Sequence, residues 1–253
     1  MELEHATVLV VDDEPMLVDI FREWLEEENG RVLTAGDGAA ASEILRREHV
    51  DLIISDVRMP VMDGILLLKN LTTHAEFPEG AHRPKMIFVS GFTDLEPREA
   101  YGLGVAALML KPIQHDYFLS EVRRTLRPRE DAWAQTPTIA DALPLHVALP
   151  PVAEAIEQGR IAFGQGGFCV PCTSSIREGP VRFDLEFEGE PVSFAGHGLV
   201  RWVDPVEGLL GVEILNLDKP CQDRVAYLLA AYATASYIPR APLSAIPKSK
   251  TAK

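Results

Sequence analysis

Four short apolar runs in the first half of the chain constrain its fold more than any other feature. They read TVLVVD, DLIISD, KMIFVS and AALMLK, and amphipathic stretches separate them. Continuous rather than alternating apolar residues are typical of strands buried on both faces of a parallel sheet. A weaker strand, RVLTAG, follows Asn29 and Gly30, and we expect Gly30 to end the helix before it.

Helical spacing of apolar residues accompanies these runs. It fits five stretches: Glu14–Glu28, Ala39–Arg47, Ile65–Leu71, Leu95–Tyr101 and Tyr117–Leu126. Five strand and helix pairs joined by right-handed crossovers make a doubly wound sheet. The sequence therefore predicts an α/β fold with a five-stranded parallel sheet, and a ligand site at the carboxyl ends of its strands.

The residues that follow the predicted strands are chemically related. Asp12 and Asp13 follow the first strand, Asp56 the third, Ser90 the fourth and Lys111 the fifth. Three neighbouring carboxylates repel one another, and a hard divalent cation with oxygen ligands, most simply Mg²⁺, relieves the repulsion. The lysine and the hydroxyl could bind the oxygens of a phosphoryl group that the central carboxylate attacks.

Four motifs arrive in order at these strand ends: VVDDE, IISDVRMPVMDG, IFVSGF and LMLKP. With them, the first 127 residues resemble the receiver domain of bacterial two-component response regulators, which has a flavodoxin-like fold. The resemblance implies that Asp56 accepts a phosphoryl group from a histidine kinase or a phosphotransfer protein. It is also compatible with a homodimer formed through the receiver.

The resemblance assigns the metal ligands as well. It implies that Asp13, Asp56 and the backbone carbonyl of Arg58 hold Mg²⁺, and that Asp12 acts through a water molecule.

It further implies that Ser90 is the switch hydroxyl, that Lys111 contacts the phosphoryl group, and that the bond before Pro112 is cis. One position departs from the family pattern, since Leu108 stands where an aromatic residue is usual. The coupling from the phosphoacceptor to the outer face is therefore expected to use other residues or to be weaker.

The second half differs in composition. Prolines without a clear period predict a linker over residues 128–144, and short glycine-punctuated strands then predict a small, mainly β barrel over residues 145–238. Asp218–Tyr237 carries apolar residues at helical spacing, which predicts a closing helix. The last stretch, residues 239–253, is predicted to be a disordered basic tail.

This half resembles a PilZ domain through GGFCV, GHGLVRWVDPVEGLLGVEI and the closing helix. Many PilZ domains bind cyclic di-GMP through an Asp-x-Ser-x-x-Gly motif, but here Ala162 and Gly164 replace the polar pair and only Gly167 matches. No Lys or Arg occurs between Asp131 and Gly159, so the family's paired arginines are absent too. Without these phosphate contacts, we expect no cyclic di-GMP binding.

Composition narrows the function classes. A formal net charge of −14 argues against a nucleic-acid partner. No apolar run approaches the roughly 20 residues that cross a bilayer, and the opening MELEHA has no signal-peptide shape, so a cytoplasmic protein without a membrane partner is expected.

Three cysteines do not suggest a disulfide framework. A zinc or redox module built from Cys169, Cys172, Cys221 and His197 stays as an alternative.

These observations predict a signalling protein that is not an enzyme. Its receiver would be phosphorylated on Asp56, and a PilZ-like output domain would contact a downstream protein partner. Two alternatives remain, a cyclic di-GMP receptor gated by phosphorylation and a scaffold whose receiver is not phosphorylated.

Overall fold

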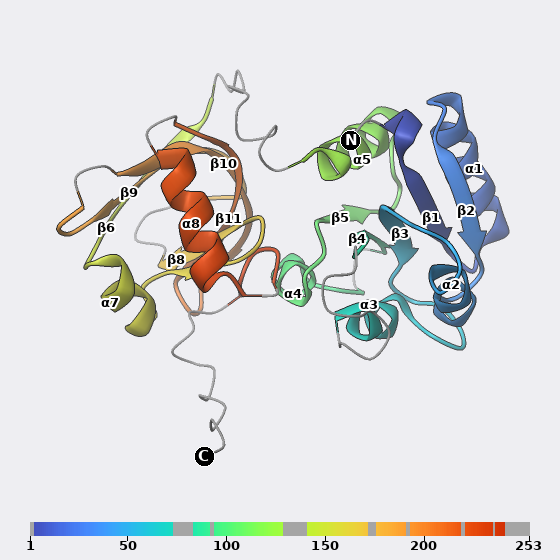
Figure 1. The fold of residues 1–253 in the computed structure, drawn as a ribbon, viewed down its shortest axis with the longest axis horizontal. Helices are drawn as coiled ribbons and strands as arrows, with labels where there is room; N and C mark the ends of the chain where they lie inside the picture. The colour runs from blue at the N-terminus through green and yellow to red at the C-terminus, as the bar shows by residue number, and fades with distance from the viewer. Residues whose placement is uncertain are drawn as a thin grey trace, which may run out of the picture. The chain divides into compact units, whose positions relative to one another are not determined.

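A computed structural model gives the fold of the chain (Figure 1). It describes residues 3–72, 83–91, 94–128, 141–171, 176–190, 193–218, 221–234 and 236–240. The chain forms two compact units, Met1–Arg129 and Glu130–Lys253, called unit 1 and unit 2 below. No helix in the described ranges is long and apolar enough to span a bilayer.

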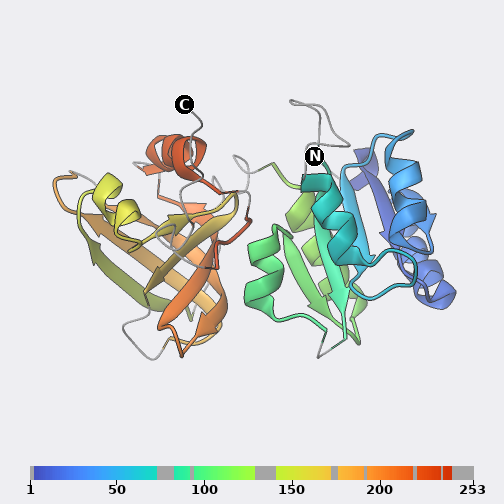
Figure 2. The same ribbon diagram turned by 90° about the horizontal axis from the view of Figure 1, so that it is seen from below.

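Unit 1 is a five-stranded parallel sheet with strand order β2-β1-β3-β4-β5 and helices on both faces (Figures 1 and 2). The strands are β1 (Thr7–Val11), β2 (Arg31–Ala35), β3 (Leu52–Asp56), β4 (Lys85–Ser90) and β5 (Ala107–Leu110). The helices are η1 (Leu3–His5), α1 (Pro15–Glu27), α2 (Gly38–Leu45), α3 (Gly64–Thr72), α4 (Pro97–Leu103) and α5 (His115–Leu126). The predicted doubly wound α/β fold is confirmed.

Two of the interior strands, β1 and β3, explain why the apolar runs are continuous. Every residue of β1 and of β3 is buried, since helices cover both faces of the sheet. On one face α1 and α5 meet through aromatic rings, with Phe21 stacked on Phe118 at a centroid separation of 4.8 Å. This packing fixes the strands whose carboxyl ends carry the predicted site residues.

The end of α1 differs from the expectation in one detail. Asn29, not Gly30, adopts the left-handed conformation, with φ of 61°. Asparagine tolerates this region better than most residues. Gly30 donates its N–H to the Leu25 carbonyl, and a Cβ there would lie only 3.0 Å from that oxygen. Gly30 therefore eases a close backbone approach and does not supply a positive φ.

Unit 2 is a strongly curved six-stranded sheet with order β6-β9-β10-β11-β8-β7 (Figure 2). Its strands are β6 (Leu143–Leu149), β7 (Ala162–Phe163), β8 (Gly167–Pro171), β9 (Gly179–Phe187), β10 (Phe194–Asp204) and β11 (Leu209–Leu217). Its helices are α7 (Val152–Glu157) and α8 (Gln222–Tyr232). The strand order has two ends, so within the described residues the sheet is an open half-barrel, mainly β as predicted.

Alternation organises the core of unit 2. In β9, Val181, Phe183, Leu185 and Phe187 are buried, while the residues between them are partly or fully exposed. Trp202 is buried from β10 against β11, where a Cβ at Gly211 would lie 2.2 Å from the indole ring. The absence of a side chain at Gly211 makes room for the tryptophan.

Two boundaries in unit 2 differ from the sequence expectation. The strand β6 begins at Leu143, inside the predicted linker, and α8 ends at Tyr232 rather than Tyr237. The helix stops early because Ser236 and Tyr237 pair through their backbone with another segment. Most of the predicted linker and of the predicted tail lies outside the described residues, and the disorder of that tail stays a prediction.

Candidate functional site

The carboxyl ends of β1, β3 and β5 meet in one acidic pocket. The Lys111 Nζ lies 3.1 Å from Asp12 Oδ2 and 3.3 Å from Asp56 Oδ2, and 3.7 Å from Glu14 Oε1. Asp12 and Asp56 are nearly buried, whereas Asp13 is exposed. Sequence reasoning therefore brought the right strand ends together.

The hydrogen bonds of the pocket fix its carboxylates. Asp12 Oδ1 accepts the backbone N–H of Glu14 at 2.8 Å, and Asp56 Oδ1 accepts that of Val57 at 2.7 Å. The opposite oxygen of each carboxylate is the one that faces Lys111. Each aspartate thus has one oxygen fixed by the backbone and one directed at the cation.

Burial raises the pKa of Asp56, and the charge of Asp12 adds to the rise, although Lys111 opposes it. For Lys111, burial lowers the pKa, but the attraction of Asp12 and Asp56 outweighs burial and raises the pKa above its usual value. In the pocket, the surroundings therefore favour the protonated form of Lys111 and disfavour the ionised form of Asp56.

A glycine makes the tight chain path behind Asp56 possible. Gly64, at the start of α3, donates its N–H to the Val57 carbonyl at 3.0 Å. A Cβ at this glycine would lie 2.3 Å from the Asp56 carbonyl oxygen. The Ser55 hydroxyl donates to the same carbonyl at 2.7 Å. Because no other residue fits so close to the backbone, the glycine of VMDG supports the position of Asp56.

Ser90 ends β4 beside this pocket and is buried. Its hydroxyl donates to the Gly91 carbonyl at 2.9 Å and lies 3.5 Å from Asp94 Oδ2. Asp94 also accepts the Gly91 N–H and forms an ion pair with Arg58, whose Nε is 2.7 Å from Asp94 Oδ1. An ion pair therefore joins the loop after β3 to the loop after β4.

Asp94 was missed by sequence reasoning. Its signal was its place four residues after Ser90, in a loop where an aspartate accepts nearby backbone N–H groups. Arg58 was predicted for its backbone carbonyl, and the contact that the structure gives it is made by its side chain. The Lys111–Pro112 bond is cis, as the resemblance implied. Leu108 is buried in β5.

The residues of the pocket fit a hard divalent cation. One carboxylate oxygen each from Asp12, Asp13 and Asp56 lies within 4.8 Å of the other two. Oxygen ligands of this kind suit Mg²⁺. Burial, with the charge of Asp12 added, raises the pKa of Asp56, and a cation bound beside these carboxylates would favour their ionised forms.

In unit 2, the glycine-rich turn Gly164–Gly167, where the cyclic di-GMP motif of PilZ domains would lie, is occupied by the chain itself. Gln165 and Gly166 donate their backbone N–H groups to the carbonyls of Ser236 and Tyr237, both at 2.8 Å. The Tyr237 ring lies over Gly166, where a Cβ would come within 2.2 Å of it. Its hydroxyl donates to Glu213 at 3.0 Å.

The cysteines behave as core residues where they are described. Cys169 and Cys221 are both buried. Burial raises the pKa of the Cys221 thiol, which donates to the Asp218 carbonyl at 2.9 Å. Neither belongs to a metal-ligating group among the described residues, and Cys172 lies outside them.

A doubly wound parallel sheet with aspartates and a lysine at its strand ends is the arrangement of receiver domains in two-component signalling. Residues 8–123 match the model of the response regulator receiver domain. The N-terminal half of the chain belongs to this family.

Relatives support the assignment. The chain is 31% identical over 150 residues to "Response regulator GtcR" of Aneurinibacillus migulanus, covering 56% of this chain and 60% of that protein. It is 30% identical over 134 residues to "Transcriptional regulatory protein YpdB" of Escherichia coli, covering 52% and 50%. It spans half to three-fifths of the length of these two curated relatives.

Among solved structures, the chain is similar to the chemotaxis response regulator CheY4 of Vibrio cholerae. The identity is 27% with a TM-score of 0.42, and the match covers 47% of this chain and 98% of that one.

Proposed function

We propose that the protein is a response regulator of a two-component phosphorelay and that Asp56 is its phosphoacceptor. The observation that carries the proposal is the shared lysine contact, with Lys111 Nζ within 3.3 Å of both Asp12 and Asp56. The phosphodonor is a histidine kinase or a phosphotransfer protein. The working place of such a protein is the cytoplasm.

The chain's own groups divide the work. An Asp56 oxygen forms the bond to phosphorus while the bond from phosphorus to the donor's nitrogen breaks. Lys111 is positioned to bind one phosphoryl oxygen. The Ser90 hydroxyl, which donates to the Gly91 carbonyl in the unphosphorylated protein, would donate to a second phosphoryl oxygen instead. Asp12, Asp13, Asp56 and the Arg58 carbonyl are the candidate Mg²⁺ ligands. When bound, the cation neutralises charge that spreads onto the phosphoryl oxygens.

The test is phosphorylation by acetyl phosphate with Mg²⁺, followed by intact-mass measurement. We expect one added phosphoryl group in the wild type and none in Asp56→Asn. Asp19→Asn is the matched control, because Asp19 is an exposed α1 residue paired with Arg22 outside the pocket, and it should be labelled like the wild type. An unlabelled wild type would favour the scaffold alternative.

For unit 2 we propose a PilZ-like output domain that works through protein contact. The half-barrel with its closing α8 supports the likeness. The occupied glycine-rich turn supports the loss of the cyclic di-GMP site, since Ser236 and Tyr237 take its backbone donors. A pull-down that compares the wild type with Asp56→Ala tests for a partner whose binding depends on phosphorylation.

Calorimetry of the full chain with cyclic di-GMP tests the ligand alternative. We expect no saturable heat at low micromolar dinucleotide. Saturable binding there would show that the dinucleotide displaces the Tyr237 segment or binds elsewhere.

A further inference from the structure

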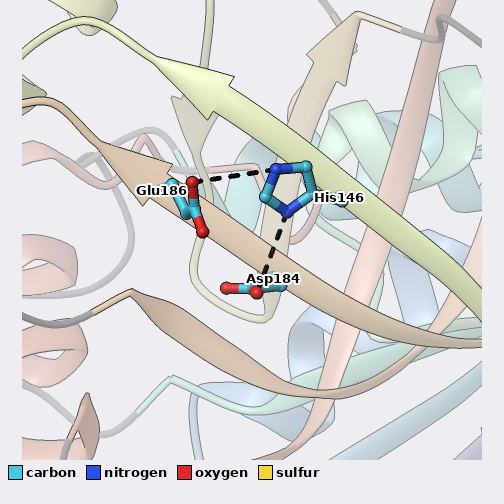
Figure 3. A group of neighbouring side chains, drawn as sticks. All are labelled: His146, Asp184 and Glu186. Atoms are coloured by element: carbon cyan, nitrogen blue, oxygen red, sulfur yellow. Dashed lines mark ion pairs between the residues drawn. The ribbon is translucent and has the colours of Figure 1, made fainter.

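Three side chains on the outer face of unit 2 form a cluster that the proposed function does not use. His146 comes from β6, and Asp184 and Glu186 come from β9 (Figure 3). One ligand atom from each lies within 4.8 Å of the other two. We call these three residues the His146 cluster.

Strand pairing brings the cluster together. β6 and β9 are parallel, and His146 is the direct partner of Asp184 in their register. Glu186 is two residues further along β9, so it projects from the same face of the sheet. All three side chains face away from the core, because the residues between them, such as Val147 and Leu185, are buried. The ordered backbone therefore presents one imidazole and two carboxylates side by side.

The charges of the cluster are poorly compensated by the chain. His146 Nδ1 lies 3.8 Å from Asp184 Oδ2, and Nε2 lies 3.8 Å from Glu186 Oε2. Within the described residues the two carboxylates have no other ion pair. Arg182, on the same face of β9, is directed at Asp218 instead, 3.9 Å away. With a neutral imidazole, the cluster carries two negative charges and no cation.

One oxygen of Asp184 has no hydrogen-bond partner of its own in the described part of the chain, although the side chain as a whole is 42% exposed. This oxygen, Oδ1, is itself shielded from solvent. A cation bound to this carboxylate would compensate the oxygen that lacks a donor.

We propose that unit 2 binds a divalent cation of the zinc class on the outer face of β6 and β9 through the His146 cluster. Imidazole selects borderline metals over Mg²⁺, and a set of one nitrogen and two carboxylate oxygens is a ligand set for Zn²⁺ or Co²⁺. Ligand atoms at the corners of a tetrahedron with bonds of about 2.1 Å are about 3.4 Å apart. In the structure Asp184 faces Nδ1 and Glu186 faces Nε2, so these exposed side chains would rotate until both carboxylates face the same ring nitrogen. Three protein ligands then leave a position open for water or for a partner's side chain.

The cluster differs from the zinc alternative built on cysteines. It uses neither Cys169 nor Cys221, which are buried. The proposal also does not depend on phosphorylation of unit 1.

The test is a Zn²⁺ titration of the full chain by calorimetry, with excess Mg²⁺ present to occupy the pocket of unit 1. We expect one equivalent at micromolar affinity in the wild type. His146→Ala should weaken this binding at least about tenfold, the loss that even an orienting partner of a metal ligand causes. Asp184→Asn and Glu186→Gln are nearly isosteric, so they keep the proposal testable should His146→Ala fold poorly.

Two controls separate the sites. His197→Ala changes the histidine of the neighbouring strand β10, and Asp56→Asn changes the pocket of unit 1, and both should bind Zn²⁺ like the wild type. Co²⁺ gives a second readout, since its visible absorption should appear in the wild type and be lost in His146→Ala. A wild type that takes up no Zn²⁺, or a His146→Ala that binds it equally well, would leave the cluster as a protonated histidine paired with two carboxylates and overturn the proposal.

Discussion

The acidic pocket of unit 1 and the His146 cluster of unit 2 both hold carboxylates close together, but the pocket is buried and the cluster is exposed to solvent. In the pocket, Asp12 and Asp56 are nearly buried and share the ammonium of Lys111. In the cluster, the side chains of Asp184 and Glu186 are 42% and 58% exposed and face an imidazole. Buried charges need a fixed cation, whereas exposed charges are solvated by water. Substitutions should therefore have large effects in the pocket and small ones in the cluster.

The largest expected effect comes from removing the pocket's cation. Lys111→Ala should slow labelling by acetyl phosphate about 10²–10³-fold, because a group positioned at developing charge commonly contributes that much. Initial rates by intact mass measure the loss. Lys111→Arg is the matched control, since it keeps the charge but alters its shape, and it should recover part of the rate. Labelling of Lys111→Ala at the wild-type rate would contradict the role given to this lysine.

The next largest effect is a difference in stability between variants of the neighbouring residues Asp12 and Asp13 in the metal-free protein. Asp12→Ala should lower the free energy of unfolding by about 1–3 kcal/mol, because it leaves the Glu14 N–H without its acceptor and removes a Lys111 partner. Asp13→Ala, on an exposed residue, should stay within about 0.5 kcal/mol of the wild type. Both variants should bind Mg²⁺ more weakly.

Urea unfolding in the presence of a chelator measures this difference. Equal stabilities for the two variants would contradict this prediction and would mean that relief of carboxylate repulsion offsets the loss of the contacts that Asp12 makes.

A smaller effect follows from the raised pKa of Asp56. Burial makes the folded state bind this proton more readily than the unfolded chain, so stability falls as pH rises above the ordinary value of 3.8. Asp56→Asn cannot ionise and should be more stable than the metal-free wild type at neutral pH. The difference in stability between Asp56→Asn and the wild type should shrink as pH falls toward 3.8. Urea midpoints across this pH range measure the difference. A wild type that is more stable than Asp56→Asn at neutral pH would contradict the prediction.

The smallest effect belongs to the His146 cluster without metal. His146→Ala should change the free energy of unfolding by less than about 1 kcal/mol, since exposed ion pairs contribute little. Urea unfolding with a chelator present is the measurement. A larger loss would indicate that the cluster holds β6 on the sheet, and the two regions would then differ less than their exposure suggests.

The fold of unit 1 was largely predictable from sequence, because its strands are buried on both faces and run parallel. Strands buried on both faces leave continuous apolar runs, and parallel strands collect their carboxyl ends at one edge. Asp12, Asp56 and Lys111 could therefore be placed together without coordinates. The contact of Arg58 with Asp94 could not, because it depends on side-chain directions in two loops.

Unit 2 was less predictable. Prolines around β6 hid a strand that starts at Leu143, and its alternating burial pattern became clear only with the fold. The His146 cluster joins residues 38 positions apart through the β6–β9 register, which no local pattern encodes. The alternation of Asp184 and Glu186 on one face of β9 was the only visible signal.

The contact between Tyr237 and the glycine-rich turn also decides where unit 2 can be cut for recombinant expression. A fragment that stops with α8 at Tyr232 would lose the carbonyls that pair with Gln165 and Gly166. It would also uncover Glu213, which is buried beside Arg201 with a contact of 2.6 Å. A fragment that keeps these groups satisfied extends past the last helix to Tyr237 at least, so a domain boundary chosen at the end of regular secondary structure would remove contacts that complete the fold of unit 2.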